Sequence, residues 1–273
     1  MPTSLAPLAP LLLGTLVLRP YVFAFLAVFA WAATRDLGAL RMLGFLAWGF
    51  AVAFVAEYAS TRVGVPFGLY HYTGATRGIE LYLGNVPFFD SLSFPFLAYA
   101  SFCLARRVLG PVDRGRMTLL AGVLMMLLDV VIDPLAVRGD RWFLGRIFYY
   151  AEAGAYFGVP LSNFAGWLVV GWVTVGGYLA VTGNGEPQPK ARRADPEMGP
   201  SGARKSARRG RPEVGVGLYY GVLLFNLAIT WWIGEMALLG AGIMIHAATF
   251  LLLYIAVGAA RARQAPAGGR GRS

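Results

Sequence analysis

Residues 117–136 read MTLLAGVLMMLLDVVIDPLA, a continuous apolar stretch that carries two acidic residues, Asp129 and Asp133. A helix needs about 20 consecutive apolar residues to cross the hydrocarbon core of a bilayer. The stretch does not alternate with period two, which favours a helix over a strand of a membrane barrel. It therefore predicts a transmembrane helix with two carboxyl groups near one end.

Six further apolar runs accompany this one. The 273-residue chain is 57% apolar and only 14% charged, which is too hydrophobic for a soluble domain. Residues 5–18 lack the basic start of a signal peptide, and we expect them to form a half-embedded lead-in to the first span. The sequence predicts an all-α bundle of about seven transmembrane helices, a single domain over residues 1–258. The six other runs are 20–34, 40–60, 92–106, 160–182, 214–233 and 236–258.

The basic residues predict an orientation in the membrane. Of the 24 Lys and Arg, 18 fall in alternate connections and in the C-terminal tail, and six fall on the other side. By the positive-inside rule the N-terminus lies outside and the C-terminus lies in the cytoplasm, with the protein in the cell membrane. Residues 183–213 and 259–273 are basic and poor in apolar residues, so we expect a disordered linker and tail. Because topology accounts for this charge, no nucleic-acid partner is expected.

Several ionisable residues lie in or at the edges of these runs without an accompanying Lys or Arg. Such residues mark a functional site by default, facing a bundle interior or a wet cavity. Asp129 and Asp133 are four residues apart and so share one face of their helix. The orientation places them near the outer face, at the depth of Glu57 and Asn163. The full set of ionisable residues is Glu57, Asp129, Asp133, Glu235 and His246.

Each candidate also has a structural interpretation. Asp133 precedes a proline and is compatible with simply ending its helix. Glu57 is five residues before Arg62, so the two could pair as an interface anchor. His246 lies alone in mid-span, as a helix-packing histidine does. Some aromatic residues suit an interfacial belt: Tyr70, His71, Tyr72, Trp231 and Trp232.

Two carboxyl groups close together in a low dielectric do not both ionise readily, so one is expected to carry a proton and act as a general acid. The alternative use is to hold a divalent cation, as the D-x-x-x-D motif of membrane prenyltransferases does. Those enzymes need a second Asp-rich motif and usually an Asn four residues before the first Asp. Here that position is Met125 and no second motif exists. We therefore expect no metal site.

Other function classes lack the residues they need. The only lysines, Lys190 and Lys205, lie in the basic linker, so a retinal Schiff base within the bundle is excluded. Membrane di-iron enzymes need about eight histidines, and this chain has two. No Gly-rich phosphate loop precedes a helix, so a nucleotide cofactor is unsupported. The single cysteine, Cys103, excludes an internal disulfide.

Three stretches together resemble a known family. They are EYASTRVGVPFGLYHY at 57–72, LDVVIDP at 128–134 and YFGVPLSNFAGW at 156–167. In this order they resemble the CruF-type membrane carotenoid hydratases, often described as carotenoid biosynthesis proteins. The resemblance covers about residues 19–182 and, more weakly, 214–258. It implies addition of water across the terminal 1,2 double bond of an acyclic carotenoid end group, as in lycopene or gamma-carotene.

The resemblance also implies roles for particular residues. Asp129 or Asp133 would protonate the alkene, and the other Asp or Glu57 would orient the water. No cofactor is implied. The partners would be a carotenoid from the lipid phase, water, membrane lipids and other enzymes of carotenoid biosynthesis. A transporter of a cation or small amphiphile remains an alternative, as does another isoprenoid enzyme such as a cyclase. The candidate substrate contacts are Arg62, Tyr70, Tyr72, Asn163, Trp167 and His246.

Overall fold

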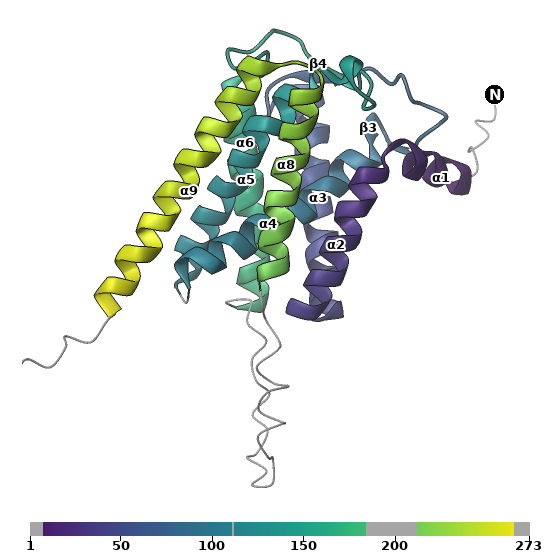
Figure 1. Cartoon of the computed structure of the whole chain (residues 1–273). Helices are drawn as coiled ribbons and strands as arrows, with labels where there is room; N and C mark the ends of the chain where they lie inside the picture. The colour runs from purple at the N-terminus through teal and green to yellow at the C-terminus, as the bar shows by residue number, and fades with distance from the viewer. Residues whose placement is uncertain (1–7, 111, 184–211, 265–273) are drawn as a thin grey trace, which may run out of the picture.

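The computed structural model describes residues 8–110, 112–183 and 212–264, with side-chain exposure to residue 258. Within these ranges the chain is a bundle of α-helices (Figure 1), so the all-α prediction is confirmed. The described helices are α1 (Leu8–Leu18), α2 (Pro20–Asp36), α3 (Ala39–Val63), α4 (Phe88–Leu109), α5 (Arg114–Ala136), α6 (Leu161–Thr182), α8 (Glu213–Trp232) and α9 (Met236–Gln264).

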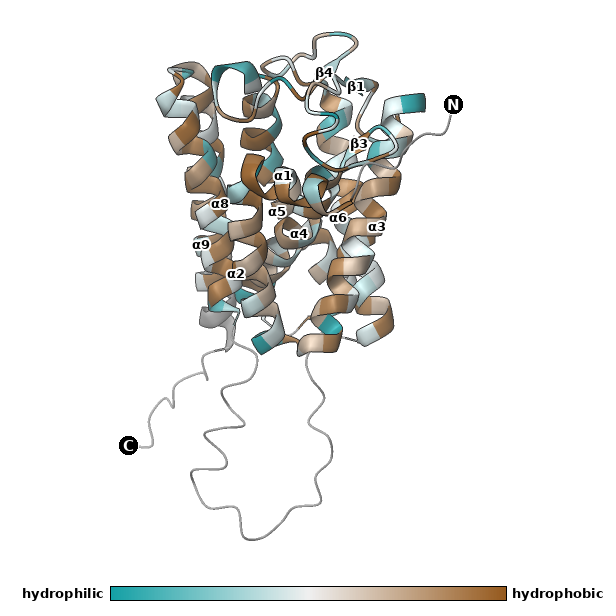
Figure 2. Ribbon diagram, turned by 90° about the vertical axis from the view of Figure 1, so that its right-hand side faces the viewer, coloured by the Kyte–Doolittle hydropathy of each residue, from teal (hydrophilic) through white to brown (hydrophobic). Residues whose placement is uncertain are grey.

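Six of these helices are long and apolar enough to span a membrane: α3, α4, α5, α6, α8 and α9. The helix pair α1 and α2 is bent by 93° and supplies a seventh span if it is counted as one. The predicted number of about seven agrees with this. Figure 2 shows mostly hydrophobic helices through the middle of the bundle, with hydrophilic segments gathered at its two ends. The chain is therefore an integral membrane protein.

A corner at Arg19 separates α1 from α2. Arg19 leaves the helical conformation, and Pro20 then takes the first position of α2, where a missing N–H is no loss. In Figure 1, α1 projects sideways from the bundle. Gly14 lets α1 pack closely against the connection at Ile79. A Cβ at position 14 would lie 1.8 Å from the carbonyl oxygen of Ile79.

Helix α4 occupies the centre of the bundle. It contacts α2, α3, α5, α6, α8 and α9, and its residues are buried along most of its length. Helices α5 and α6 also pack closely, because a Cβ on Gly171 would come within 2.9 Å of the Cα of Gly122. Small residues commonly allow such close approach between membrane helices. Because α4 contacts six other helices, it fixes their positions relative to one another.

Two long connections cover one end of the bundle. Strand β1 (Tyr70–Tyr72) pairs antiparallel with β4 (Phe148–Tyr150), which places Tyr70 opposite Tyr150. We call this pair the β1–β4 ribbon. A short hairpin of β2 (Tyr82–Leu83) and β3 (Val86–Pro87) leads into α4, and a 3-10 turn, η1 (Gly139–Arg141), follows α5. The ribbon joins segments that are far apart in the sequence and sets them over the ends of α3 and α5.

Some predicted bounds differ from the structure. Helix α4 begins at Phe88 rather than at residue 92, since the hairpin before it delivers Pro87 as the residue that caps the helix. Helix α9 continues to Gln264, past the predicted end at residue 258. Pro134 does not end α5 at Asp133, because the helix runs on to Ala136. Most of the predicted basic linker, residues 184–211, and the tail from 265 onward lie outside the described residues.

Candidate functional site

A cavity lies under the β1–β4 ribbon, with about 900 Å³ of empty space that includes its open mouth. Its polar side chains come from the ends of α3, α4, α5 and α6 and from the ribbon itself. Apolar and aromatic residues make up the rest of its wall. The polar lining residues at this end are Glu57, Tyr70, Tyr72, Asp90, Ser93, Asp133, Tyr150 and Asn163.

Three carboxyl groups line the cavity, each supplied by a different helix. Glu57 on α3 is only 2% exposed and accepts a hydrogen bond from the Ser91 hydroxyl. Asp90, in the first turn of α4, accepts from the Tyr72 hydroxyl at 2.5 Å. Asp133 on α5 accepts from the Tyr150 hydroxyl at 3.3 Å. We call Glu57, Asp90 and Asp133 the carboxyl cluster.

Asp129 lies one turn deeper on α5 than Asp133, as their spacing predicts. It is fully buried and does not line the cavity. Its Oδ2 accepts a hydrogen bond from the Asn163 amide at 2.6 Å, and its Oδ1 has no hydrogen-bond partner among the described residues. Asn163 does line the cavity, so Asp129 reaches the site through this amide. Of the two carboxyls on α5, Asp133 is the one that can touch a bound molecule.

The ribbon tyrosines lie among the carboxyls. Burial raises the pKa of Tyr70 well above its usual value, and the negative charges of Glu57, Asp90 and Asp133 raise it further. Burial and the neighbouring carboxyls likewise raise the pKa of Tyr72 and of Tyr150. These hydroxyls therefore stay protonated at neutral pH and act as hydrogen-bond donors. The aromatic-belt interpretation of Tyr70 is wrong, since this side chain is buried.

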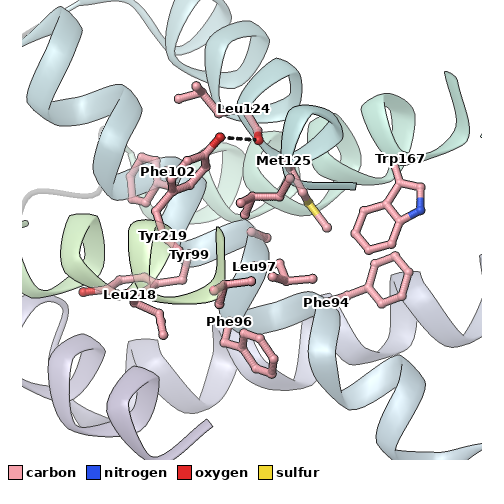
Figure 3. Packing of buried hydrophobic residues seen from close by; sticks show 14 of the residues in the cluster. Phe94, Phe96, Leu97, Tyr99, Phe102, Leu124, Met125, Trp167, Leu218 and Tyr219 are labelled. Carbon is pink, nitrogen blue, oxygen red and sulfur yellow. Dashed lines mark hydrogen bonds between the residues drawn. The ribbon is translucent and has the colours of Figure 1, made fainter. Parts of the chain in front are cut away.

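Stacked aromatic rings close one wall of the cavity. The Trp167 ring lies parallel to the Phe94 ring, with centroids 4.4 Å apart and planes within 13° (Figure 3). Phe67 contacts both rings, with centroids 5.9 Å from Phe94 and 6.1 Å from Trp167. All three side chains are buried. The wall thus offers π-electron density next to the carboxyl cluster, a setting suited to a positive charge.

Comparison with known proteins assigns the chain to a family. A family model described as carotenoid biosynthesis protein matches residues 17–248. The chain belongs to the carotenoid biosynthesis protein family. The family predicted from the three sequence stretches is thereby confirmed, and all the residues of the cavity lie inside the matched range.

This family member is similar to a protein named bisanhydrobacterioruberin hydratase from Haloarcula japonica. The two are 32% identical over 166 residues, which make up 60% of this chain and 51% of the other. The chain therefore spans about half the length of that curated relative. No solved structure matches the chain.

Three candidates from the sequence lie apart from the cavity of this family member. Arg62 is exposed; it donates to the Tyr58 carbonyl and to Asn85 Oδ1 at 2.9 Å each, rather than to Glu57. His246 on α9 packs near α5 and does not line the cavity, which agrees with a helix-packing histidine. Glu235 forms ion pairs with Arg138, at 3.2 Å, and with Arg141, so its expected lack of a basic partner is wrong.

Three polar lining residues were not predicted from the sequence: Asp90, Ser93 and Tyr150. The apolar run begins at residue 92, which leaves Asp90 in the connection before it. An acidic residue just after Val86-Pro87 is typical of a first helical turn, and that signal could have found it. Tyr150 lies in a connection, and no local pattern brings it to Asp133. Within the described residues, no group of three or more His, Cys, Asp or Glu side chains is placed to hold a metal ion.

Proposed function

We propose that this protein is a carotenoid 1,2-hydratase, which adds water to the terminal double bond of an acyclic carotenoid end group such as that of lycopene or gamma-carotene. Membership of the carotenoid biosynthesis family and similarity to a protein named as a hydratase support this. The observation that carries the proposal is the carboxyl cluster set against stacked aromatic rings, inside a cavity of a membrane bundle.

The reaction begins with a proton transfer to C2 of the alkene, which leaves a tertiary cation at C1. The oxygen of one water then bonds to C1 and gives up a proton, so the product is a tertiary 1-hydroxy carotenoid. The atoms balance as alkene plus one water: the acid gives one proton, the water releases one proton to a second carboxyl, and transfer of that proton back to the acid resets the site. No electrons are exchanged with an outside acceptor. The proposed step therefore calls for no redox cofactor.

Asp133 is assigned as the general acid because it lines the cavity, whereas Asp129 lies behind it. Glu57 also lines the cavity and is placed to accept the proton released by the water. Asp129 is assigned a positioning role, holding Asn163 through their hydrogen bond. The cation forms beside Trp167, Tyr70 and Tyr72, whose ring faces stabilise positive charge.

Replacing Trp167 with Leu is expected to lower kcat by about thirtyfold, because a desolvated cation–π contact is worth about 2 kcal/mol. Trp231→Leu is the matched control, since Trp231, near the C-terminal end of α8, is 65% exposed and does not line the cavity. We expect that control to behave as the unmodified protein. Equal losses in the two variants would argue against a catalytic role for Trp167. The measurement is initial rate at saturating polyene in reconstituted membranes.

We propose that the protein resides in the cell membrane with the carboxyl cluster toward the outer face and the C-terminus in the cytoplasm, as the basic residues indicate. Its substrate comes from the lipid phase, and its water comes from the outer side. Other enzymes of carotenoid biosynthesis would supply the acyclic end group.

The direct test is expression in a bacterium that accumulates lycopene, followed by mass analysis of the pigments. We expect products heavier than lycopene by one water, or by two where both ends react. Unchanged lycopene, with the protein present in the membrane, would refute the proposal for that substrate. A new pigment of unchanged mass would indicate a cyclase, and a product that gains an isoprenoid unit would indicate a prenyltransferase. Uptake of a cation or amphiphile without a new pigment would indicate a transporter.

A further inference from the structure

The cavity has a second part, which is apolar and built by different helices. The carboxyl cluster lies on α3, α4 and α5, whereas this second part, the apolar arm, is bounded by α2 and α8 with a contribution from α4. Its residues carry no charge, and the Asn226 amide that also faces it already donates to the Val222 carbonyl at 2.9 Å. The apolar arm is lined by Tyr21, Val22, Phe25, Phe96, Leu97, Val222 and Phe225.

Aromatic rings close the apolar arm at the seam between α2 and α8. The Tyr21 and Phe225 rings stack with centroids 5.2 Å apart, and Phe25 meets Phe225 edge-on at 5.6 Å. Ring contacts of this kind can be opened by side-chain rotation, without breaking a helix. The opposite wall, made by Trp167, Phe94 and Phe67, is buried instead.

The outer side of this seam faces lipid. Val28 on α2, about one turn after Phe25, is 40% exposed, and Leu224 on α8, next in sequence to Phe225, is 63% exposed. Large apolar side chains exposed on spanning helices contact hydrocarbon. Tyr21, Phe25 and Phe225 line the cavity and are themselves only half-buried, so they lie between the apolar arm and the surface of the bundle.

A conjugated polyene is rigid and extended, so it cannot fold into a cavity that accommodates its end. We propose that the polyene lies in the apolar arm and leaves the protein between α2 and α8, with Tyr21, Phe25 and Phe225 as a lateral gate. This rests on the proposed function and specifies how its substrate binds. In this arrangement the carboxyl cluster contacts only the end group of the polyene, and the rest of the polyene enters from the lipid through the gate.

If the polyene lies in the apolar arm, a residue that fills the arm should slow hydration of a long substrate more than that of a short one. The test uses the full chain in lipid vesicles and two substrates with the same terminal alkene, a long acyclic polyene and a short acyclic isoprenoid hydrocarbon. Val222→Trp fills the apolar arm. Leu224→Trp makes the same change two residues away on the lipid-facing side of α8. The readout is the ratio of kcat/KM for the long substrate to that for the short one.

We expect Val222→Trp to lower this ratio by at least about tenfold, equivalent to about 1.4 kcal/mol, and Leu224→Trp to leave it unchanged. Phe225→Ala, which removes a gate ring without adding bulk, is expected to raise the ratio, and it decides the matter if Val222→Trp does not insert. An equal effect on both substrates, or the same fall in Leu224→Trp, overturns the gate. Failure of the unmodified protein to hydrate either substrate would instead sink the proposed function.

Discussion

Replacing Asp133 with Asn is expected to lower hydration by at least about a hundredfold, since a positioned general acid contributes about 10²- to 10⁴-fold to rate. Asn keeps the size of the side chain and can still accept from the Tyr150 hydroxyl, but it has no proton to deliver to the alkene. The measurement is single-turnover conversion of a polyene by protein reconstituted in lipid.

Two further variants make this result specific to Asp133. Asp140→Asn removes an exposed carboxyl just beyond the same helix and is expected to change nothing. Asp129→Asn is expected to lower the rate less than Asp133→Asn, because Asp129 acts through Asn163. Full activity in Asp133→Asn would remove Asp133 from the acid role. A larger loss in Asp129→Asn than in Asp133→Asn would reverse the assignment of the two.

Loss of the Arg19–Glu80 ion pair is expected to destabilise the protein by about 3–5 kcal/mol, the usual result of leaving one charge of a buried pair alone. Arg19 is 1% exposed; it contacts Glu80 at 3.0 Å and donates to the Leu144 carbonyl at 2.5 Å. Its guanidinium also lies 4.4 Å from the centre of the Phe89 ring, beside the cavity. Arg19→Ala would therefore loosen the corner between α1 and α2 and both covering connections.

Unfolding in detergent, followed by thermal or denaturant titration, measures this change. The control is Arg146→Ala, because Arg146 is exposed in one of the same connections and should contribute within about 0.5 kcal/mol. A double variant, Arg19→Met with Glu80→Leu, is expected to be more stable than Arg19→Ala, since it leaves no charge unpaired. If Arg19→Ala were as stable as Arg146→Ala, the pair would have no role in holding the corner.

The helices and part of the site follow from short-range patterns in the sequence. Apolar run length gives the spans, and a spacing of four residues puts Asp129 and Asp133 on one face. The same periodicity does not show which of these two aspartates lines a cavity. That depends on where α6 places Asn163, which covers Asp129 and leaves Asp133 facing the cavity. Glu57 and Asn163 were expected at the depth of Asp133, and in the structure all three line one cavity together with Tyr70, Tyr72 and Trp167.

Other features depend on contacts between distant parts of the chain. Tyr150 reaches Asp133 because β4 pairs with β1, some 80 residues earlier in the sequence. Arg19 and Glu80 meet because the connection before α4 folds back onto the α1–α2 corner. Asp90 joins the site because Pro87 starts α4 earlier than its hydrophobicity indicates. None of these three has a local signal as strong as a spanning run.

The β1–β4 ribbon ties the evolution of two connections together. Side chains alternate between the faces of a strand, so a one-residue insertion within either strand would turn Tyr72 or Tyr150 away from its carboxyl. A length change in one connection would have to be matched by a change in the other, or fall outside the paired segments. Insertions or deletions in the paired part of one connection are thus expected to be accompanied by a matching change in the other, so that the two connections evolve together.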